Sequence, residues 1–391
     1  MRRLLRARSV LGGVGLCATL LLGGAGSTVF GLCGSFTDVS DAAFCPFVLE
    51  IFNLGITTGT TATTYDPAAN VSRLQMAAFL SRTVDGVLKR GSRRSALNRF
   101  SIPKNGDVLD VTTVGSAAAY PVADGLDIWV PNSLDASVSR VRASDGSLLG
   151  TWSGASFASG SLSAMGKIFV VGSLAPGVLY RIDPRQPPSA VTTVASNLGG
   201  APIRLAFDGA SIWTANDQEG AGSVSIVTPG VSIPWTVTTV TAGFGALQGV
   251  LFDGTNVWVT SGPQALLRLD SSGAILQTVT VGTSPFYPVF DGANIWIPDE
   301  GADSLTVVRA SNGTVLSTLT GNGMNHPWEA AFDGERVLVT NQFGDSVSLW
   351  KAADLSPIGT FPTGTSSNPL GACSDGVNFW ITIRGNQLAR F

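Results

Sequence analysis

A short pattern recurs seven times between residues 124 and 380, and it limits the possible folds more than any other feature of the sequence. Six copies begin with Asp-Gly, and a hydrophobic pair that usually ends in Trp follows, as in Asp253-Gly254 with Val257-Trp258. A weaker copy starts at Met165-Gly166. The copies are 41, 43, 45, 38, 42 and 42 residues apart. So regular a period predicts a chain built from repeated supersecondary units.

Each unit contains four short strand signals. In one unit, Trp328 to Phe332 leads into the turn dipeptide Asp333-Gly334, and strand-like segments follow at 336–341, 345–350 and 358–361. Four strands in about 42 residues are typical of a β-propeller blade. The units lack helical spacing, which excludes a helical solenoid of similar period. We therefore expect a mainly β fold, a seven-bladed propeller of four-stranded blades over residues 106–391.

The two ends of this region predict how the ring closes. The last unit stops at Phe391, after its third strand, while residues 106–115 resemble the fourth-strand sequence at 273–282. We expect residues 106–115 to pair with residues 379–391, because this pairing leaves no open sheet edge in the ring.

Residues 1–30 have the order of an export signal. Four arginines within the first eight residues precede the uncharged segment Val10 to Gly26, and small residues follow. A retained N-terminal membrane segment is the alternative. Export would place Cys33 and Cys45 in an oxidising compartment, where they either form a disulfide or remain small buried thiols.

Residues 33–90 read as a small helical module. Asp41 to Leu54 has helical apolar spacing, and Ser72 with Gln75 forms a capping-box pattern at the start of a second helix. The stretch resembles one S-layer homology repeat, on the pieces Phe36-Thr37-Asp38-Val39, Leu54-Gly55-Ile56, Tyr65-Asp66-Pro67 and Val71-Ser72-Arg73-Leu74-Gln75-Met76-Ala77.

That resemblance implies attachment to the cell envelope through wall or envelope polysaccharide, and it implies that Arg73 contacts the glycan. An ordinary solvated arginine is the alternative for Arg73. Family members usually carry three such repeats, whereas this chain shows one.

Charge divides the chain into two parts. Residues 1–100 hold 11 basic and 5 acidic side chains, whereas residues 101–391 hold 13 and 22. The segment 91–105 reads as a basic linker, or alternatively as an electrostatic foot for anionic envelope polymers. The overall net charge of −3 argues against a nucleic-acid partner.

The repeats resemble YVTN/NHL-type propellers, a group that shares its fold with streptogramin B lyase and quinoprotein-like proteins. Propellers usually bind at the face formed by the loops before the first strand and after the second strand. There we expect a glycan, peptide or protein ligand, and a Mg or Ca ion is possible on the acidic groups. The candidate ligand face comprises Asn132, Asn216, Asp217, Asp299, Glu300, Asn341, Asp345 and Arg384. The alternative is that these residues only shape turns.

His326 is the only imidazole in the chain. With Glu329 it forms the alternative candidate site, that of a metal-dependent lyase- or hydrolase-like propeller enzyme. The tryptophans of the repeat fit packing between blades, whereas Trp152, Trp235 and Trp328 lie outside the pattern and are candidates for ligand contacts. The sequence therefore predicts an exported, cell-envelope-associated protein whose propeller binds a partner, with catalysis as the alternative and no other cofactor implied.

Overall fold

The computed structural model describes residues 33, 36–41, 44–53, 57, 59–61, 63–80, 83, 110–218 and 221–391. The chain forms two compact units, Met1–Leu88 and Lys89–Phe391. The expected export signal (1–30) and basic linker (91–105) lie outside the described residues. No helix in the described part of the chain is long and apolar enough to cross a membrane.

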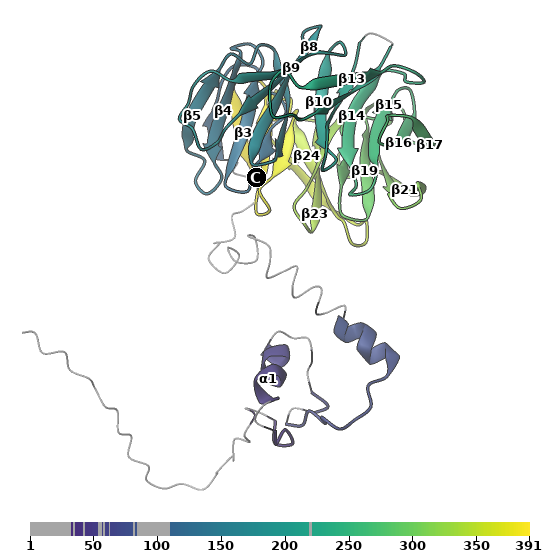
Figure 1. The fold of residues 1–391 in the computed structure, drawn as a ribbon. Helices are drawn as coiled ribbons and strands as arrows, with labels where there is room; N and C mark the ends of the chain where they lie inside the picture. The colour runs from purple at the N-terminus through teal and green to yellow at the C-terminus, as the bar shows by residue number, and fades with distance from the viewer. Residues whose placement is uncertain are drawn as a thin grey trace, which may run out of the picture. The chain divides into compact units, whose positions relative to one another are not determined.

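The larger unit is a seven-bladed β-propeller, as the sequence predicts (Figure 1). Each blade is an antiparallel sheet of four strands in consecutive order, except the last, which takes its outer strand from the start of the unit. The seven blades are β2–β5 (Val122–Ala123, Asp127–Asn132, Ser137–Arg142, Leu148–Ser153), β6–β9 (Ala158–Ala164, Lys167–Gly172, Gly177–Ile182, Thr192–Leu198), β10–β13 (Pro202–Phe207, Ile212–Asn216, Ser223–Thr228, Thr236–Val240), β14–β17 (Leu247–Phe252, Val257–Ser261, Ala265–Leu269, Ile275–Thr280), β18–β21 (Val289–Phe290, Asn294–Asp299, Ser304–Arg309, Thr314–Thr320), β22–β25 (Pro327–Phe332, Arg336–Asn341, Ser346–Lys351, Pro357–Pro362) and β26–β28 (Ala372–Ser374, Phe379–Ile383, Gln387–Arg390) with β1 (Asp110–Thr113).

Strand β1 closes the ring. It pairs antiparallel with β28, with Asp110 opposite Arg390 and Thr113 opposite Gln387. The predicted pairing of residues 106–115 with 379–391 is therefore confirmed for the described residues. Strand β1 ties the two ends of the unit together and covers the edge of β28, which would otherwise be the exposed outer edge of a three-stranded blade.

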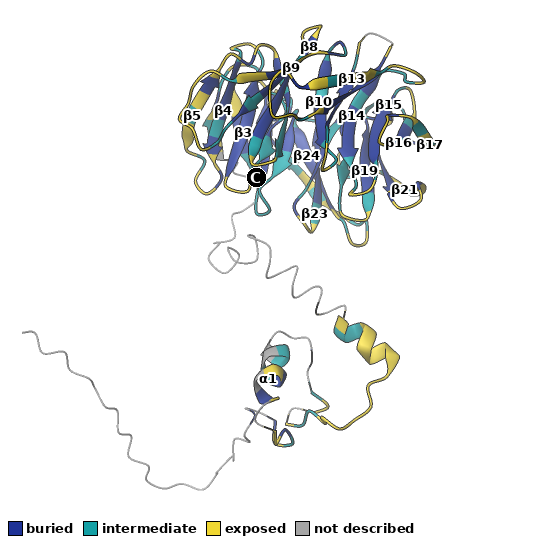
Figure 2. Cartoon of the chain, in the orientation of Figure 1, coloured by how far each residue is buried: buried dark blue, intermediate teal, exposed yellow. Residues whose placement is uncertain are grey.

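The core consists of seven hydrophobic clusters, each shared by two neighbouring blades. The repeat tryptophans sit in these clusters, and Trp129, Trp213, Trp258, Trp296 and Trp380 are all fully buried. Trp380 of the last blade packs on Ile128 and Val130 of the first, so the same contact also closes the circle. Figure 2 shows the burial falling from inner strands such as β3 to outer strands such as β5.

The repeat motif is a hydrogen-bonded clamp at the turn between the first and second strands. Asp253 Oδ1 accepts from the backbone N–H groups of Thr255 and Asn256, both at 2.7 Å, and Oδ2 accepts from Trp258 Nε1 at 2.7 Å. One carboxylate thus fixes the turn and satisfies the buried indole. The same indole bond occurs at Trp129–Asp124 (2.8 Å), Trp213–Asp208 (2.6 Å), Trp296–Asp291 (2.7 Å) and Trp380–Asp375 (2.9 Å).

The two divergent copies show how the turn is built when the tryptophan is absent. The second blade has neither member: Phe169 occupies the Trp position and a turn at Met165-Gly166 replaces the Asp turn. The sixth blade has Leu338 at the Trp position, and its Asp333 Oδ2 instead accepts from Arg336 Nε at 2.8 Å. No buried indole N–H is left unpaired at this position in either blade.

The smaller unit contains helix α1 (Cys45–Asn53) and a second helical segment at residues 73–80. Phe36 packs edge-on against Phe52, with ring centroids 5.0 Å apart, in a cluster that also contains Val39 and Val48. Asp38 Oδ1 accepts from the backbone N–H of Tyr65 at 2.8 Å, and its Oδ2 from that of Asp66 at 2.6 Å. Asp38 thus links the segment of the S-layer homology motif that begins at Phe36 to the segment that begins at Tyr65.

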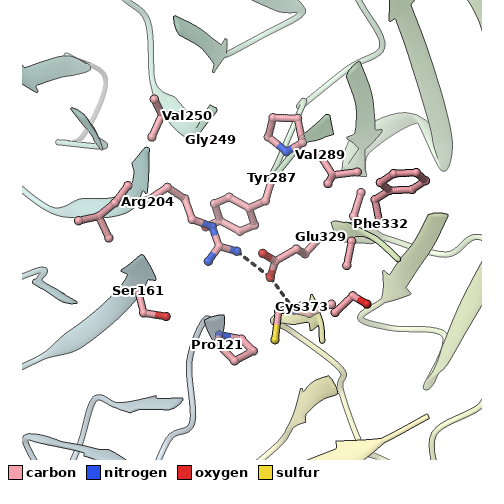
Figure 3. A pocket seen from close by; sticks show the side chains of 16 residues that line it. Pro121, Ser161, Arg204, Gly249, Val250, Tyr287, Val289, Glu329, Phe332 and Cys373 are labelled. Carbon is pink, nitrogen blue, oxygen red and sulfur yellow. Dashed lines mark hydrogen bonds and ion pairs between the residues drawn. The ribbon is translucent and has the colours of Figure 1, made fainter. Parts of the chain in front are cut away.

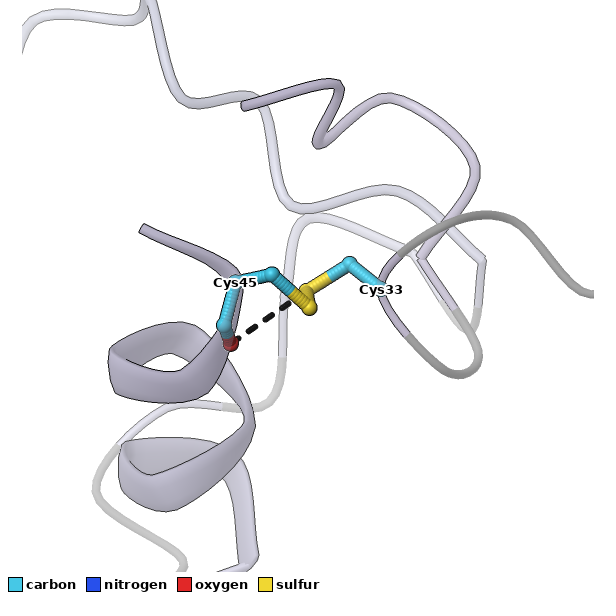
Figure 4. Close-up of a disulfide and its surroundings, with 2 residues drawn as sticks. All are labelled: Cys33 and Cys45. Carbon is cyan, nitrogen blue, oxygen red and sulfur yellow. Dashed lines mark hydrogen bonds between the residues drawn. A yellow bond between two sulfur atoms is a disulfide. The ribbon is translucent and has the colours of Figure 1, made fainter. Parts of the chain in front are cut away.

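Two further contacts complete this unit. Cys33 and Cys45 form a disulfide with Cα atoms 5.2 Å apart (Figure 4). At the second helix, Ser72 N–H donates to Gln75 Oε1 (2.9 Å) and Gln75 N–H donates to Ser72 Oγ (3.2 Å), which is a capping box. The described residues leave two apolar side chains of this helix uncovered, since Leu74 is 85% exposed and Leu80 is 59% exposed.

Candidate functional site

The first strands of the blades surround a central channel. Each first strand contacts the first strands of both neighbours, all the way around the ring. One position per blade forms a layer across this channel, four residues before the turn Asp in the six blades that have one. We call these seven residues the channel ring; they are Tyr120, Gly160, Arg204, Gly249, Tyr287, Glu329 and Gly371.

Arg204 and Glu329 meet inside the channel ring (Figure 3). Arg204 Nη2 lies 2.8 Å from Glu329 Oε2, and the two side chains are only 11% and 12% exposed. The same oxygen of Glu329 accepts from the backbone N–H of Ala372 at 2.8 Å. The pair therefore joins the third, sixth and seventh blades across the channel.

Aromatic side chains enclose the arginine. Its guanidinium carbon lies 3.4 Å from the ring centroid of Tyr120 and 3.8 Å from that of Tyr287. Tyr120 Oη donates to Tyr287 Oη at 3.1 Å, and Trp328 Nε1 donates to Tyr120 Oη at 3.3 Å. Because the aromatic faces carry negative potential, they stabilise the buried cation.

Burial dominates the acid–base properties of this layer. It raises the pKa of Glu329 to about 7, although the positive charge of Arg204 acts in the opposite direction. Burial also raises the pKa values of Tyr287 and Cys373 well above their ordinary values, so both remain neutral near pH 7. Of these three groups, Glu329 is therefore the one whose pKa lies near neutral pH.

A cavity of about 270 Å³ adjoins the Arg204–Glu329 pair. We call it the channel cavity. Its walls come from the channel ring and from the parts of the first strands that lead to the Asp-Gly turns; they include Pro121, Ser161, Leu205, Val250, Val289, Ala330, Ala331, Phe332 and Cys373 (Figure 3). The cavity thus lies on the turn side of the ring, not on the side of the expected ligand face.

Four residues of the expected ligand face have a structural role instead. Asn132, Asn216, Asp299 and Asn341 end the second strands and are fully buried. Asn132 Nδ2 donates to the hydroxyls of Ser137 and Ser139, each at 3.0 Å, and Asn216 and Asn341 make the same pair of bonds. At Asp299 the direction is reversed, because Ser304 and Thr306 donate to its Oδ2. Their burial removes these four side chains from the surface that a ligand would meet.

The other four remain accessible but are partly engaged. Asp217 Oδ2 accepts from Gln248 Nε2 at 2.8 Å, and burial raises the pKa of Asp217. Asp345 accepts from the backbone N–H groups of Ser366 (2.7 Å) and Asn368 (3.0 Å), and these bonds, that from Asn368 foremost, lower its pKa. Arg384 is exposed. The accessible polar groups of this face therefore lie in loops of four different blades.

His326 and Glu329, the alternative catalytic pair, have different partners. His326 Nε2 lies 3.3 Å from Glu300 Oε1, and its ring is 4.2 Å from that of Phe343. Glu329 faces Arg204. The structure brings Glu300 rather than Glu329 to the histidine, because His326 lies in the loop before β22 whereas Glu329 lies within β22 and faces Arg204. Glu300 comes from the adjacent blade.

The remaining candidate ligand contacts are partly buried and partly accessible. Trp152 and Trp235 are buried in interblade clusters and are therefore not ligand contacts, while Trp328 is partly exposed beside the channel ring. Arg73 is exposed at the start of the second helix of the small unit. Among the described residues, no three His, Cys, Asp or Glu side chains gather in a way that could hold a metal ion.

Arg204 and Tyr287 were absent from the sequence-based candidates. The signal that would have found them is the repeat itself. At the Asp-Gly turn the blades repeat the same residue, whereas four positions earlier they diverge into Tyr, Arg, Gly and Glu. Reading the repeat for divergence as well as for similarity would have identified the channel ring.

Comparisons with known proteins agree with the two units. Residues 35–77 match the S-layer homology domain. A search of curated protein sequences gave no match. Among solved structures, a streptogramin B lyase aligns with a TM-score of 0.59 at 12% identity, covering 72% of this chain and 96% of that chain. Virginiamycin B lyase from Staphylococcus aureus gives 0.59 at 15% identity, with 72% and 98% covered.

The WD40 β-propeller domain of Doa1 gives a TM-score of 0.58 at 12% identity, with 73% of this chain and 97% of that chain covered. At such identities the likeness concerns the fold and not the activity. The chain thus carries an S-layer homology domain, which indicates anchoring at the cell surface, followed by a seven-bladed β-propeller similar in fold to streptogramin lyases.

Proposed function

We propose that this protein is an exported, envelope-anchored binding protein. Its S-layer homology domain holds it to wall or envelope polysaccharide, and its propeller binds a ligand of its own. One combination carries the proposal: a domain of an anchoring family is joined to a propeller whose channel contains a buried, charged and cavity-facing pair. Buried charges are costly to maintain for packing alone, which favours a role in binding.

The disulfide supports export, because such bonds persist in oxidising compartments. The exposed position of Arg73 fits a contact with an anionic or hydroxyl-rich polymer. The exposed apolar residues of the second helix offer further surface to the same polymer or to protein neighbours in the envelope.

Sedimentation with purified cell-wall sacculi tests the tether. We expect the full chain to co-sediment and a chain lacking residues 33–90 to stay in solution, with the propeller still folded by circular dichroism. Arg73→Gln should weaken retention. Arg142→Gln is the matched control, because Arg142 is an exposed arginine of the propeller. Undiminished retention of the deleted chain would reject the tether.

A second candidate function is catalytic, and the His326–Glu300 pair favours it. A carboxylate that orients an imidazole is a common arrangement for a general base. If this pair is catalytic, His326→Ala should abolish turnover of a glycan or peptide substrate, and Glu300→Gln should lower it strongly. If either variant retains full turnover, the pair has only a structural role in the loops of the expected ligand face.

A further inference from the structure

The channel cavity has the Arg204–Glu329 pair at one end and a mixed lining elsewhere. Leu205, Val250, Val289, Ala330, Ala331 and Phe332 contribute apolar side chains, while Ser161 and Ser374 contribute hydroxyl groups. Its volume of about 270 Å³ equals about nine waters at their liquid volume of about 30 Å³ each. This lining suits a small molecule with one charged group and a compact body that contacts both apolar side chains and hydroxyl groups.

The hydrogen-bonding capacity of Arg204 is not exhausted by the protein. A guanidinium carries five N–H donors in a planar fork. Glu329 Oε2 lies 2.8 Å from Nη2, but Nε and Nη2 are both buried without an aligned hydrogen-bond acceptor among the described residues. Arginine forks match carboxylates because two N–H groups can donate to two oxygens in parallel.

Glu329 can act as a donor to the same ligand. Its Oε2 faces Arg204 and Ala372, which leaves Oε1 for a proton when the carboxyl is neutral. We propose that the channel cavity binds a small monocarboxylate, whose anionic group accepts hydrogen bonds from Arg204 and from the protonated carboxyl of Glu329. This inference rests on the proposed function only in assigning the propeller a ligand.

The charged and titratable groups around Glu329 define the pH response. Arg204 from β10, Tyr287 beside β18, Tyr120 beside β2 and Cys373 from β26 surround it. Burial keeps Tyr287 and Cys373 neutral, and raises the pKa of Glu329 to about 7. Above that pH an ionised Glu329 repels the ligand, so each further pH unit should weaken binding about tenfold. Below it, affinity should level off.

Calorimetric titration of the full chain with benzoate tests the inference, with benzamide as the uncharged probe of the same shape. We expect benzoate to bind at about pH 6, to bind far more weakly at about pH 8, and to exceed benzamide at the lower pH. Glu329→Gln should retain binding, because its amide also donates, but should lose the pH dependence. Arg204→Gln should abolish binding.

Two further variants keep the test decisive. The double variant Arg204→Gln/Glu329→Gln leaves no unpaired buried charge and should fold without binding benzoate, even if Arg204→Gln alone does not fold. His326→Gln is the control for the only imidazole and should leave the pH profile unchanged. Failure of benzoate to bind at about pH 6, equal binding of benzamide, or an unchanged pH profile in Glu329→Gln would overturn the inference. Sacculus retention uses no benzoate, so a failure of the tether would be seen separately.

Discussion

The Asp-Gly turn and the channel ring are two regions of the same repeat, and they differ in what they repeat. At the turn, five blades use the same Asp and Trp pair, and every indole makes the same bond. In the channel ring, the equivalent positions hold Tyr, Gly, Arg or Glu. A position that recurs in each blade serves the contact between blades, which is identical around the ring. A position whose residue differs from blade to blade serves a feature that occurs once in the ring, such as the Arg204–Glu329 pair.

Substitution of a clamp tryptophan should produce the largest effect. Trp258→Ala removes a fully buried side chain and leaves Asp253 without its indole donor, so we expect a loss of about 3–5 kcal/mol in the free energy of unfolding. Trp328→Ala, beside the channel ring, should cost much less because Trp328 is partly exposed. Urea denaturation measures both, and similar losses would remove the distinction between the two regions.

The channel ring should make stability depend on pH. Burial raises the pKa of Glu329 from 4.5 to about 7, so between these pH values the folded state binds more protons than the unfolded state. The free energy of unfolding should therefore fall as pH rises through this window, by roughly 3 kcal/mol from this group. Glu329→Gln should remove this part of the decline. Glu335→Gln, at an exposed carboxylate of the same blade, should leave the decline in place.

Asp299 tests whether a residue that departs from the repeat lowers the stability of the folded protein. Asn occupies the same place in three other blades, and burial raises the pKa of Asp299 from 3.8 to about 6. Asp299→Asn should stabilise the protein by roughly 3 kcal/mol above about pH 6, because it removes a buried charge and its amide can donate to Ser304 and Thr306. The reverse exchange, Asn341→Asp, should destabilise it in the same pH range. Thermal melts across pH compare the pair, and effects of equal sign would contradict this account.

The smallest effect is expected beside the ring. Ser161 Oγ donates to the backbone oxygen of Tyr120 at 2.7 Å, in a partly buried position. Ser161→Ala should therefore cost only about 1 kcal/mol in the free energy of unfolding, the usual net value of one hydrogen bond. Urea denaturation can detect this difference. A loss in the free energy of unfolding as large as that of Trp258→Ala would show that Ser161 stabilises the fold as much as the repeat tryptophans do.

Much of the fold was predictable because local pattern and period carry it. The Asp-Gly turns, the alternation of the strands and the resemblance of residues 106–115 to a fourth strand predicted the blade number and the closure by β1. The ligand face was predicted less well. Asn132 and Asn341 were chosen as polar residues in loops, yet they are buried where second strands end, and their bonds to Ser137 and Ser346 cannot be read from polarity alone.

By itself, the sequence determined the seven blades, the way the ring closes, the interblade role of the repeat tryptophans and the S-layer homology module. Each of these follows from contacts that are local or repeated. Only the tertiary structure decided that Arg204 meets Glu329 and that His326 meets Glu300. Those pairs lie across the ring or between blades, and their geometry depends on how seven sheets close around one axis, which no local pattern encodes.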